Sequence, residues 1–155
     1  MADVSFENRV VIVTGAGNGL GKAYALELGK RGAKVVVNDL GGAVDGSGSG
    51  NSPADDVVNE IIENGGEAVA NYDSVATEDG GESIVQTAVD SFGTVDAVIN
   101  NAGILRDKSF ANMTEKEFSL IIEVHLKGTY FVTQPAFKIM KENNYGRIVN
   151  VASPS

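Results

Sequence analysis

Short runs of β-branched and other apolar residues alternate along the chain with longer stretches in which apolar residues recur every three or four positions. The first pattern is typical of buried strands and the second of amphipathic helices. The runs that predict strands cover residues 9–14, 34–38, 67–71, 95–99 and 147–151. The stretches that predict helices cover residues 19–31, 52–64, 79–92 and 114–143.

This alternation predicts an α/β fold in three layers, a doubly wound parallel sheet of Rossmann type with helices on both faces. Residues 41–52 are rich in glycine and predict a loop between the second strand and the second helix. Sheets of this kind bind ligands beyond the carboxyl ends of their strands. The residues directly after each strand are therefore the first candidates for function.

Local signals also place the ends of two helices. The Ser-Pro pair at 52–53 gives the second helix a capping hydroxyl and a proline in its first turn. Thr114 and Glu117 have the spacing of a capping box, which predicts the start of the last helix. Pro135 lies inside that helix, where its ring would clash with the carbonyl of Phe131. We therefore expect a kink or a break at Pro135.

Composition removes several classes of function. The sequence has no cysteine, which excludes disulfides, thiolate zinc sites and thiol catalysis, and its single histidine excludes a multi-histidine metal site. We expect no metal. The formal net charge is −9, and residues 35–105 hold 13 acidic residues and no Lys or Arg. Such a surface repels phosphate backbones, so nucleic acid is not an expected partner.

No apolar run reaches the length of a membrane span, and the N-terminus lacks the basic and apolar regions of a signal peptide. We therefore expect a soluble intracellular protein without a membrane partner.

The loop after the first strand predicts a phosphate site. Its glycines follow the pattern Gly-x-x-x-Gly-x-Gly at Gly15, Gly19 and Gly21, and not the common Gly-x-Gly-x-x-Gly. Glycines let the backbone turn tightly and approach a ligand, and the helix behind them offers unpaired N–H groups. We expect the pyrophosphate of a dinucleotide to bind here, with Asn18 and Leu20 also in contact.

Asp39 ends the second strand, where a carboxylate can accept hydrogen bonds from both hydroxyls of the adenosine ribose. A 2′-phosphate would meet this carboxylate with like charge. The loop residues Ala16, Gly17 and Asn18 are uncharged, and no basic residue follows Asp39 before Arg106. The expected cofactor is therefore NAD rather than NADP.

Two further strand ends carry candidate cofactor ligands. Asp73 and Ser74 follow the third strand and can hydrogen-bond an adenine edge, with Val75 beside them. Asp-Ser is also common in turns, so this signal is weak alone. The sequence Asn-Asn-Ala-Gly at 100–103 follows the fourth strand, and we expect Asn101, Ala102 and Gly103 to bring backbone against the cofactor. Listed in chain order, these strand-end candidates are Asp73, Ser74, Val75, Asn101, Ala102 and Gly103.

Together these strand ends resemble the short-chain dehydrogenase/reductase family over the whole chain. The motifs are Thr-Gly-x-x-x-Gly-x-Gly at 14–21, Asn-Asn-Ala-Gly at 100–103 and a serine after the fifth strand. The stretches 37–42, 71–75, 100–107, 124–128 and 145–149 resemble most closely the (3R)-hydroxyacyl-CoA dehydrogenase part of peroxisomal multifunctional enzymes of type 2, and its bacterial relatives.

This resemblance implies a catalytic serine, tyrosine and lysine. Ser153 matches the serine that hydrogen-bonds the substrate oxygen, and Ser155 is a second choice. The sequence contains no Tyr-x-x-x-Lys, where the family places its proton donor and the lysine that lowers the tyrosine pKa. We therefore expect residues 1–155 to be the NAD-binding portion of a longer domain, with the C-terminal part of the fold missing. Many members carry an asparagine where this chain has His125, and the multifunctional group shares the histidine.

The resemblance implies oxidation of (3R)-3-hydroxyacyl-CoA to 3-oxoacyl-CoA with NAD in fatty-acid β-oxidation, in the peroxisomal matrix of a eukaryote or the cytoplasm of a bacterium. An acyl-carrier-protein 3-oxoacyl reductase is an alternative, although its usual NADPH conflicts with the missing basic residues. A methyltransferase using S-adenosylmethionine conflicts with the Asn-Asn-Ala-Gly motif, and a non-catalytic nucleotide-binding module remains open. The many apolar residues of 118–140 predict burial on more than one side, and hence a homodimer or homotetramer.

Overall fold

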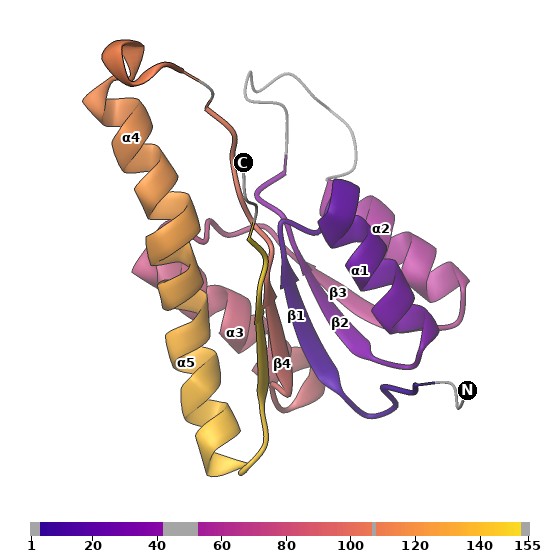
Figure 1. Cartoon of the computed structure of the whole chain (residues 1–155). Coiled ribbons are helices and arrows are strands. Elements are labelled where there is room, and N and C mark those ends of the chain that lie inside the picture. Colours follow the sequence, from indigo (N-terminus) through magenta and orange to yellow (C-terminus); the bar gives the residue numbers. More distant parts are fainter. Residues whose placement is uncertain (1–3, 42–52, 107, 153–155) are drawn as a thin grey trace.

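The computed structural model describes residues 4–41, 53–106 and 108–152, and Figure 1 shows the chain as a sheet between two layers of helices. The five strands are all parallel and lie in the order β3-β2-β1-β4-β5. Their bounds are Val10–Thr14 for β1, Lys34–Asn38 for β2, Glu67–Asn71 for β3, Ala97–Asn100 for β4 and Arg147–Asn150 for β5. The strand order reverses between β1 and β4, which makes the sheet doubly wound and confirms the expected fold class.

Helices cover both faces of this sheet (Figure 1). One layer contains α1 (Gly19–Lys30) and α2 (Pro53–Glu63). The other contains α3 (Glu78–Phe92) and a long rod made of α4 (Glu115–Ile122), the π-helical turn η2 (Glu123–Lys127) and α5 (Gly128–Glu142). A short 3₁₀ turn, η1 (Phe110–Asn112), precedes the rod.

Alternate residues of the central strands fill the two cores. Val10 and Ile12 of β1 pack with α3 and α5, whereas Val11 and Val13 pack with α1 and α2. All five residues of β1 are buried. Because both faces of the sheet are apolar, polar chemistry in the central strands is confined to their ends.

The expected break at Pro135 is wrong, because α5 runs continuously through this residue from Gly128 to Glu142. The irregular turn lies earlier, at Glu123–Lys127. Pro135 has no N–H to donate to the carbonyl of Phe131. Gly81 of α3 packs directly on that carbonyl, where a Cβ would come within 2.4 Å of the oxygen. Helix α3 therefore packs closely against α5 at the turn that contains Pro135.

Other boundaries fall within a few residues of the expectation. The capping box is confirmed: Thr114 accepts from the N–H of Glu117, whose carboxylate accepts from the N–H of Thr114. β4 begins later than expected and ends at Asn100. The expected glycine-rich loop falls almost entirely in 42–52, outside the described residues.

Among the described helices, none is long and apolar enough to cross a membrane.

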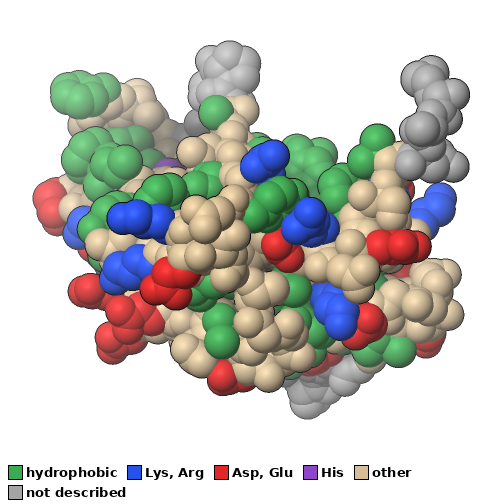
Figure 2. Space-filling model, turned by 90° about the horizontal axis from the view of Figure 1, so that it is seen from below, with side chains coloured by type: hydrophobic (Ala, Val, Ile, Leu, Met, Phe, Trp, Pro, Cys, Tyr) green, Lys and Arg blue, Asp and Glu red, His purple; other side chains and the backbone are tan. Residues whose placement is uncertain are grey.

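The rod keeps several large apolar side chains exposed. Phe118, Leu126, Tyr130 and Phe137 are each more than half exposed. Figure 2 shows hydrophobic side chains gathered at its upper left, on the side of the molecule that α4 and α5 form, with acidic and basic side chains below and beside them. Residues 118–140 were expected to be buried on more than one side, but the rest of this chain does not cover these side chains.

Candidate functional site

The carboxyl ends of β1, β2, β3 and β4 surround a cavity of about 220 Å³. It is lined by residues expected to bind a cofactor, namely Gly15, Asp39, Asp73, Ser74, Val75, Ala102 and Gly103. Four further residues complete the lining, namely Asn38, Leu40, Ile104 and Val124. The remaining expected ligands, Asn18, Gly19, Leu20, Gly21 and Asn101, lie outside this lining. The fold therefore brings four separate strand ends to one cavity.

The glycine loop has a backbone that other residues would disturb. Gly15 and Gly19 adopt left-handed conformations, with φ of +62° and +55°. Gly21 is buried where α1 begins, and a Cβ there would lie 2.1 Å from the carbonyl oxygen of Gly15. Among the described residues, no atom beyond the adjacent backbone lies within 4 Å of a Cβ built on Gly19.

The N-terminus of α1 differs from those of α3 and α4. Thr77 caps α3 and Thr114 caps α4 with their side chains, but Asn18 makes no side-chain hydrogen bond to the first turn of α1. The first turn also contains no acidic residue, and Leu20 is exposed. Within the described part of the chain, no side chain caps the N–H groups of this turn, and the helix dipole favours an anion there.

Thr14 and Asn101 fasten the glycine loop to the end of β4. The buried hydroxyl of Thr14 accepts from the N–H groups of Asn101 and Ala102, at 3.1 and 3.0 Å. The side-chain amide of Asn101 donates to the carbonyls of Thr14 and Gly15, both at 3.0 Å. Asn101 thus holds the glycine loop in place and does not line the cavity itself. The structural role of Thr14 was not expected from the sequence, although it belongs to the quoted motif.

The carboxylate of Asp39 is held by the backbone. Its Oδ2 accepts from the N–H of Gly17 at 2.8 Å, and its Oδ1 accepts from the N–H of Gly41 at 3.1 Å. A Cβ on Gly17 would lie 2.8 Å from this carboxyl group and 2.7 Å from Pro53. The absence of a side chain at position 17 therefore lets the phosphate loop and the end of β2 approach each other.

The segment after β3 reaches the cavity through Asp73, Ser74 and Val75. The hydroxyl of Ser74 accepts from the N–H of Ala76 at 3.2 Å, which makes a local turn. Val75 is buried and packs closely against Gly128 of α5. The segment is thus anchored to the rod while Asp73 stays exposed at the cavity.

The π-helical turn of the rod contacts the loop after β4. The ring of His125 lies beside Gly103, where a Cβ would come within 2.7 Å of it. Its Nε2 is within hydrogen-bond distance of the backbone of Ile104. Sequence reasoning missed Ile104 and Val124 as lining residues, since apolar residues at these positions look like ordinary core.

Ser153 lies outside the described residues, so the structure does not test this candidate. The strand before it is placed: Asn150 of β5 pairs with Asn100 of β4, and the N–H of Val151 donates to the carbonyl of Asn100. The carboxyl end of β5 therefore lies at the same edge of the sheet as the cavity.

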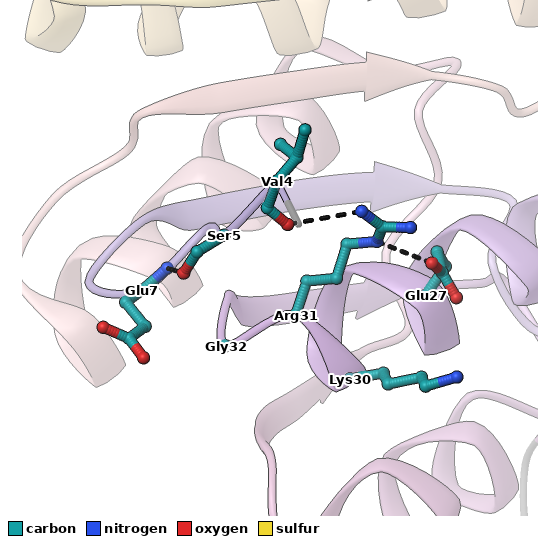
Figure 3. A pocket seen from close by; sticks show the side chains of 7 residues that line it. All are labelled: Val4, Ser5, Glu7, Glu27, Lys30, Arg31 and Gly32. Carbon is teal, nitrogen blue, oxygen red and sulfur yellow. Dashed lines mark hydrogen bonds and ion pairs between the residues drawn. The ribbon is translucent and has the colours of Figure 1, made fainter. Parts of the chain in front are cut away.

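A second cavity, of about 470 Å³, lies between the N-terminal segment and the end of α1 (Figure 3). Arg31 spans it, donating to the carbonyl of Val4 and to the carboxylate of Glu27. This hydrogen bond and the charge of Arg31 lower the pKa of Glu27. The cavity touches none of the strand carboxyl ends, and its arginine attaches the N-terminal segment to α1. We therefore assign the functional site to the smaller cavity.

Comparison with known proteins shows the family of the chain. The model of the short chain dehydrogenase family matches residues 9–155. The chain is 57% identical, over 99% of its length, to the peroxisomal hydratase-dehydrogenase-epimerase of Saccharomyces cerevisiae. It is 60% identical, over 97% of its length, to peroxisomal multifunctional enzyme A of Dictyostelium discoideum. It is 55% identical, over 97% of its length, to peroxisomal multifunctional enzyme type 2 of Mus musculus. It spans 17%, 33% and 20% of these relatives.

Solved structures share the fold as well as the sequence. A short chain dehydrogenase from Mycobacterium avium superposes with a TM-score of 0.88 at 46% identity, covering 97% of this chain and 56% of its own. A 7α-hydroxysteroid dehydrogenase, crystallised with NADH and 7-oxo glycochenodeoxycholic acid, gives 0.85 at 30% identity, covering 96% and 55%. The matched family model, the shared fold and the relatives at this level of identity together show that the chain belongs to the short-chain dehydrogenase family.

Proposed function

We propose that this chain forms the cofactor-binding part of an NAD-dependent dehydrogenase that oxidises (3R)-3-hydroxyacyl-CoA to 3-oxoacyl-CoA. The observation that carries the proposal is the convergence of four strand ends on one cavity, beside a helix N-terminus without a side-chain cap. The family supports an oxidoreductase with a nicotinamide cofactor, and the neighbour crystallised with NADH agrees. The acyl-CoA substrate rests on the resemblance of the sequence to the (3R)-hydroxyacyl-CoA dehydrogenase part of the multifunctional enzymes, and one relative is named a hydratase-dehydrogenase-epimerase.

The residues present fit a dinucleotide. Gly15, Gly19 and Gly21 leave room for a pyrophosphate on the open N–H groups of α1. Asp39 lines the cavity and would accept hydrogen bonds from the adenosine ribose, while Asp73 would accept one from the adenine amine. When bound, the nicotinamide accepts hydride from the substrate carbon.

Asp39 carries the preference for NAD over NADP. Two backbone N–H groups hold its carboxylate, so it cannot swing far from the ribose side without losing both hydrogen bonds. A 2′-phosphate placed there would meet a fixed negative charge. Gly17, packed against Asp39 and Pro53, has no room for a basic side chain that would neutralise this phosphate.

Ser153 is the proposed catalytic residue of this chain. It follows β5, whose carboxyl end lies at the same edge of the sheet as the cavity. Its hydroxyl would donate a hydrogen bond to the reacting oxygen of the substrate, where negative charge develops. The proton itself needs a base, which the family provides in the Tyr-x-x-x-Lys motif that residues 1–155 lack. The compartment proposed from the relatives is the peroxisomal matrix in a eukaryote.

Titration calorimetry of the full-length protein with NAD and with NADP tests the cofactor. We expect NAD to bind about tenfold or more tightly, the effect of roughly 1.4 kcal/mol of repulsion. Replacing Asp39 by Ala and Leu40 by Arg should reduce or reverse this preference. Asp90→Ala, which removes a carboxylate of α3 outside the cavity, is the matched control. A wild type that prefers NADP would contradict the proposal and favour a 3-oxoacyl-carrier-protein reductase.

The substrate is tested separately, by dehydrogenase turnover of (3R)-3-hydroxyacyl-CoA and of its (3S) isomer with the full-length protein. We expect turnover of the (3R) form alone. Activity on neither thioester would contradict the proposed substrate while leaving the cofactor assignment intact.

A further inference from the structure

Three of the four polar atoms of Asp73 are held by its neighbours. Its N–H donates to Oδ1 of Asn71 at 3.0 Å, and its carbonyl accepts from Nδ2 of Asn38 at 2.9 Å. Its Oδ2 accepts from Nδ2 of Asn71 at 3.0 Å and from the hydroxyl of Ser83 at 2.6 Å. Within the part of the chain that the structure describes, only Oδ1 of this residue lacks a hydrogen-bond partner.

The two asparagines behind Asp73 are buried, and both amide atoms of Asn71 are hydrogen-bonded. Asn38 of β2 and Asn71 of β3 stand opposite each other in the sheet, 2% and 5% exposed. Nδ2 of Asn38 donates to Oδ1 of Asn71 at 2.9 Å, and Nδ2 of Asn71 also donates to the hydroxyl of Thr87 at 2.9 Å. No buried side-chain nitrogen or oxygen lacks a partner among the described residues.

This arrangement is costly unless it serves the site. The preceding residues of the two strands, Val37 and Ala70, pair across the sheet with apolar side chains. A buried amide pair must satisfy every donor and acceptor to match such an apolar pair in stability. Three of the side-chain hydrogen bonds that Asn38 and Asn71 make join them to Asp73, which lines the cavity. The pair therefore fixes one carboxylate rather than adding apolar core.

We propose that Asn71, supported by Asn38 and Ser83, is a positioning residue that makes the site selective for a 6-aminopurine dinucleotide. The inference rests on the proposed function, in which Asp73 meets the adenine. The donors on Oδ2 fix the carboxylate in one orientation and leave Oδ1 as a pure acceptor. An exocyclic amine can donate to that oxygen. A purine with a carbonyl oxygen at this position would place two acceptors against each other.

Equilibrium binding of NAD and of its hypoxanthine analogue, nicotinamide hypoxanthine dinucleotide, tests this with the full-length protein. Wild type should bind NAD about tenfold or more tightly, in the range of one hydrogen bond to a charged group. Ser83→Ala and Asn71→Ala should bring the ratio of the two Kd values towards one, by weakening NAD and leaving the analogue almost unchanged. The ratio is the decisive readout, because general damage to the site weakens both ligands alike.

Gln86→Ala is the matched control: Gln86 lies on α3 one turn beyond Ser83, and its side chain bonds only to Asp90 among the described contacts. Gln86→Ala should keep the wild-type ratio. If Asn71→Ala fails to fold, Ser83→Ala still decides, since its hydroxyl is a single contact at the helix surface. A wild-type ratio in both variants, or equal weakening of both ligands, overturns the inference. A wild type that binds NAD and the analogue equally overturns it too, whereas one that binds neither contradicts the proposed function itself.

Discussion

The Nε2 atom of His125 lies 2.9 Å from the carbonyl oxygen of Ile104 and 3.1 Å from its amide nitrogen. One ring nitrogen either donates to the carbonyl or accepts from the N–H, so it satisfies one of these groups at a time. His125 lies in the π-helical turn of the rod, and Ile104 lines the cavity. The rod therefore holds the loop after β4 in place through this histidine.

His125→Ala should weaken NAD binding about two- to tenfold, the range of one lost hydrogen bond of 0.5–1.5 kcal/mol, because the loop at Ile104 loses its support. His125→Gln should bind more like wild type than His125→Ala, since its terminal amide can reach the place of Nε2, donate to the carbonyl and accept from the N–H together. Calorimetric Kd values for the three proteins check this. Unchanged affinity in His125→Ala would show that the contact does not support the cofactor site.

Gly19 and Gly21 offer a matched pair within one loop. The methyl group of Gly19→Ala meets no described residue within 4 Å, so its expected cost of about 1–2 kcal/mol comes from the left-handed backbone. Gly21→Ala places a methyl group 2.1 Å from the carbonyl of Gly15, so backbone must move. We expect Gly19→Ala to fold with a modest loss, and Gly21→Ala to lose more stability and most dinucleotide binding. Urea unfolding and NAD titration measure both, and equal effects would contradict the steric argument.

The strands and the glycine loop were predictable from the sequence because β-branched runs and glycine spacing are local signals. The parallel direction of the five strands followed from their alternation with helices, whereas their order in the sheet was not predicted, and the capping box at Thr114 followed from four adjacent residues. The asparagine pair behind Asp73 was not predictable, since it depends on the register that sets Asn38 opposite Asn71. The break expected at Pro135 is wrong for a similar reason, because the helix is continuous and Gly81 of α3, distant in sequence, packs on the carbonyl of Phe131.

The capping box at the start of α4 should make the stability of the folded protein depend on pH in the acidic range. Hydrogen bonds from Lys108 and Thr114 lower the pKa of Glu117 from 4.5 to about 2. A lowered folded-state pKa stabilises the protein above the unfolded pKa, and this stabilisation is lost as the pH falls towards 2. Glu117→Gln should therefore be less stable than wild type at pH 7, with the difference shrinking between about pH 5 and pH 2. Urea midpoints across this range check the trend, and a constant difference would contradict it.

The exposed apolar residues of the rod predict self-association. Leu126, Tyr130 and Phe137 follow one another by four and seven residues, which places them on one side of the rod, and each is more than half exposed. Burying such a stripe removes apolar surface from water, at about 25 cal/mol per Å². We expect the full-length protein to be a homodimer or homotetramer, and Phe137→Glu to weaken the assembly. Sedimentation at micromolar concentration measures the mass, and a monomeric wild type would contradict the prediction.

Residues 1–155 alone should show no dehydrogenase turnover. The strand ends that would bind the dinucleotide are present, but the sequence has no Tyr-x-x-x-Lys to move the proton of the substrate oxygen. General acid–base catalysis of this kind is typically worth about 10²–10⁴-fold. A neutral serine hydroxyl at Ser153 can stabilise an oxyanion, but it is a poor base. Appreciable turnover by this chain would show that the tyrosine is dispensable.

In the full-length protein, Ser153→Ala should lower kcat/KM by about a hundredfold or more while the Kd for NAD stays constant. The change removes a hydrogen bond to the reacting oxygen and none to the cofactor. Ser119→Ala is the control, because that hydroxyl bonds to Glu115 within α4, outside the cavity lining. Steady-state rates with calorimetric Kd values separate the two effects. Full activity in Ser153→Ala would transfer the role to Ser155, two residues further from β5, whereas a parallel loss of NAD affinity would mean that Ser153 supports the cofactor site and not the reacting oxygen.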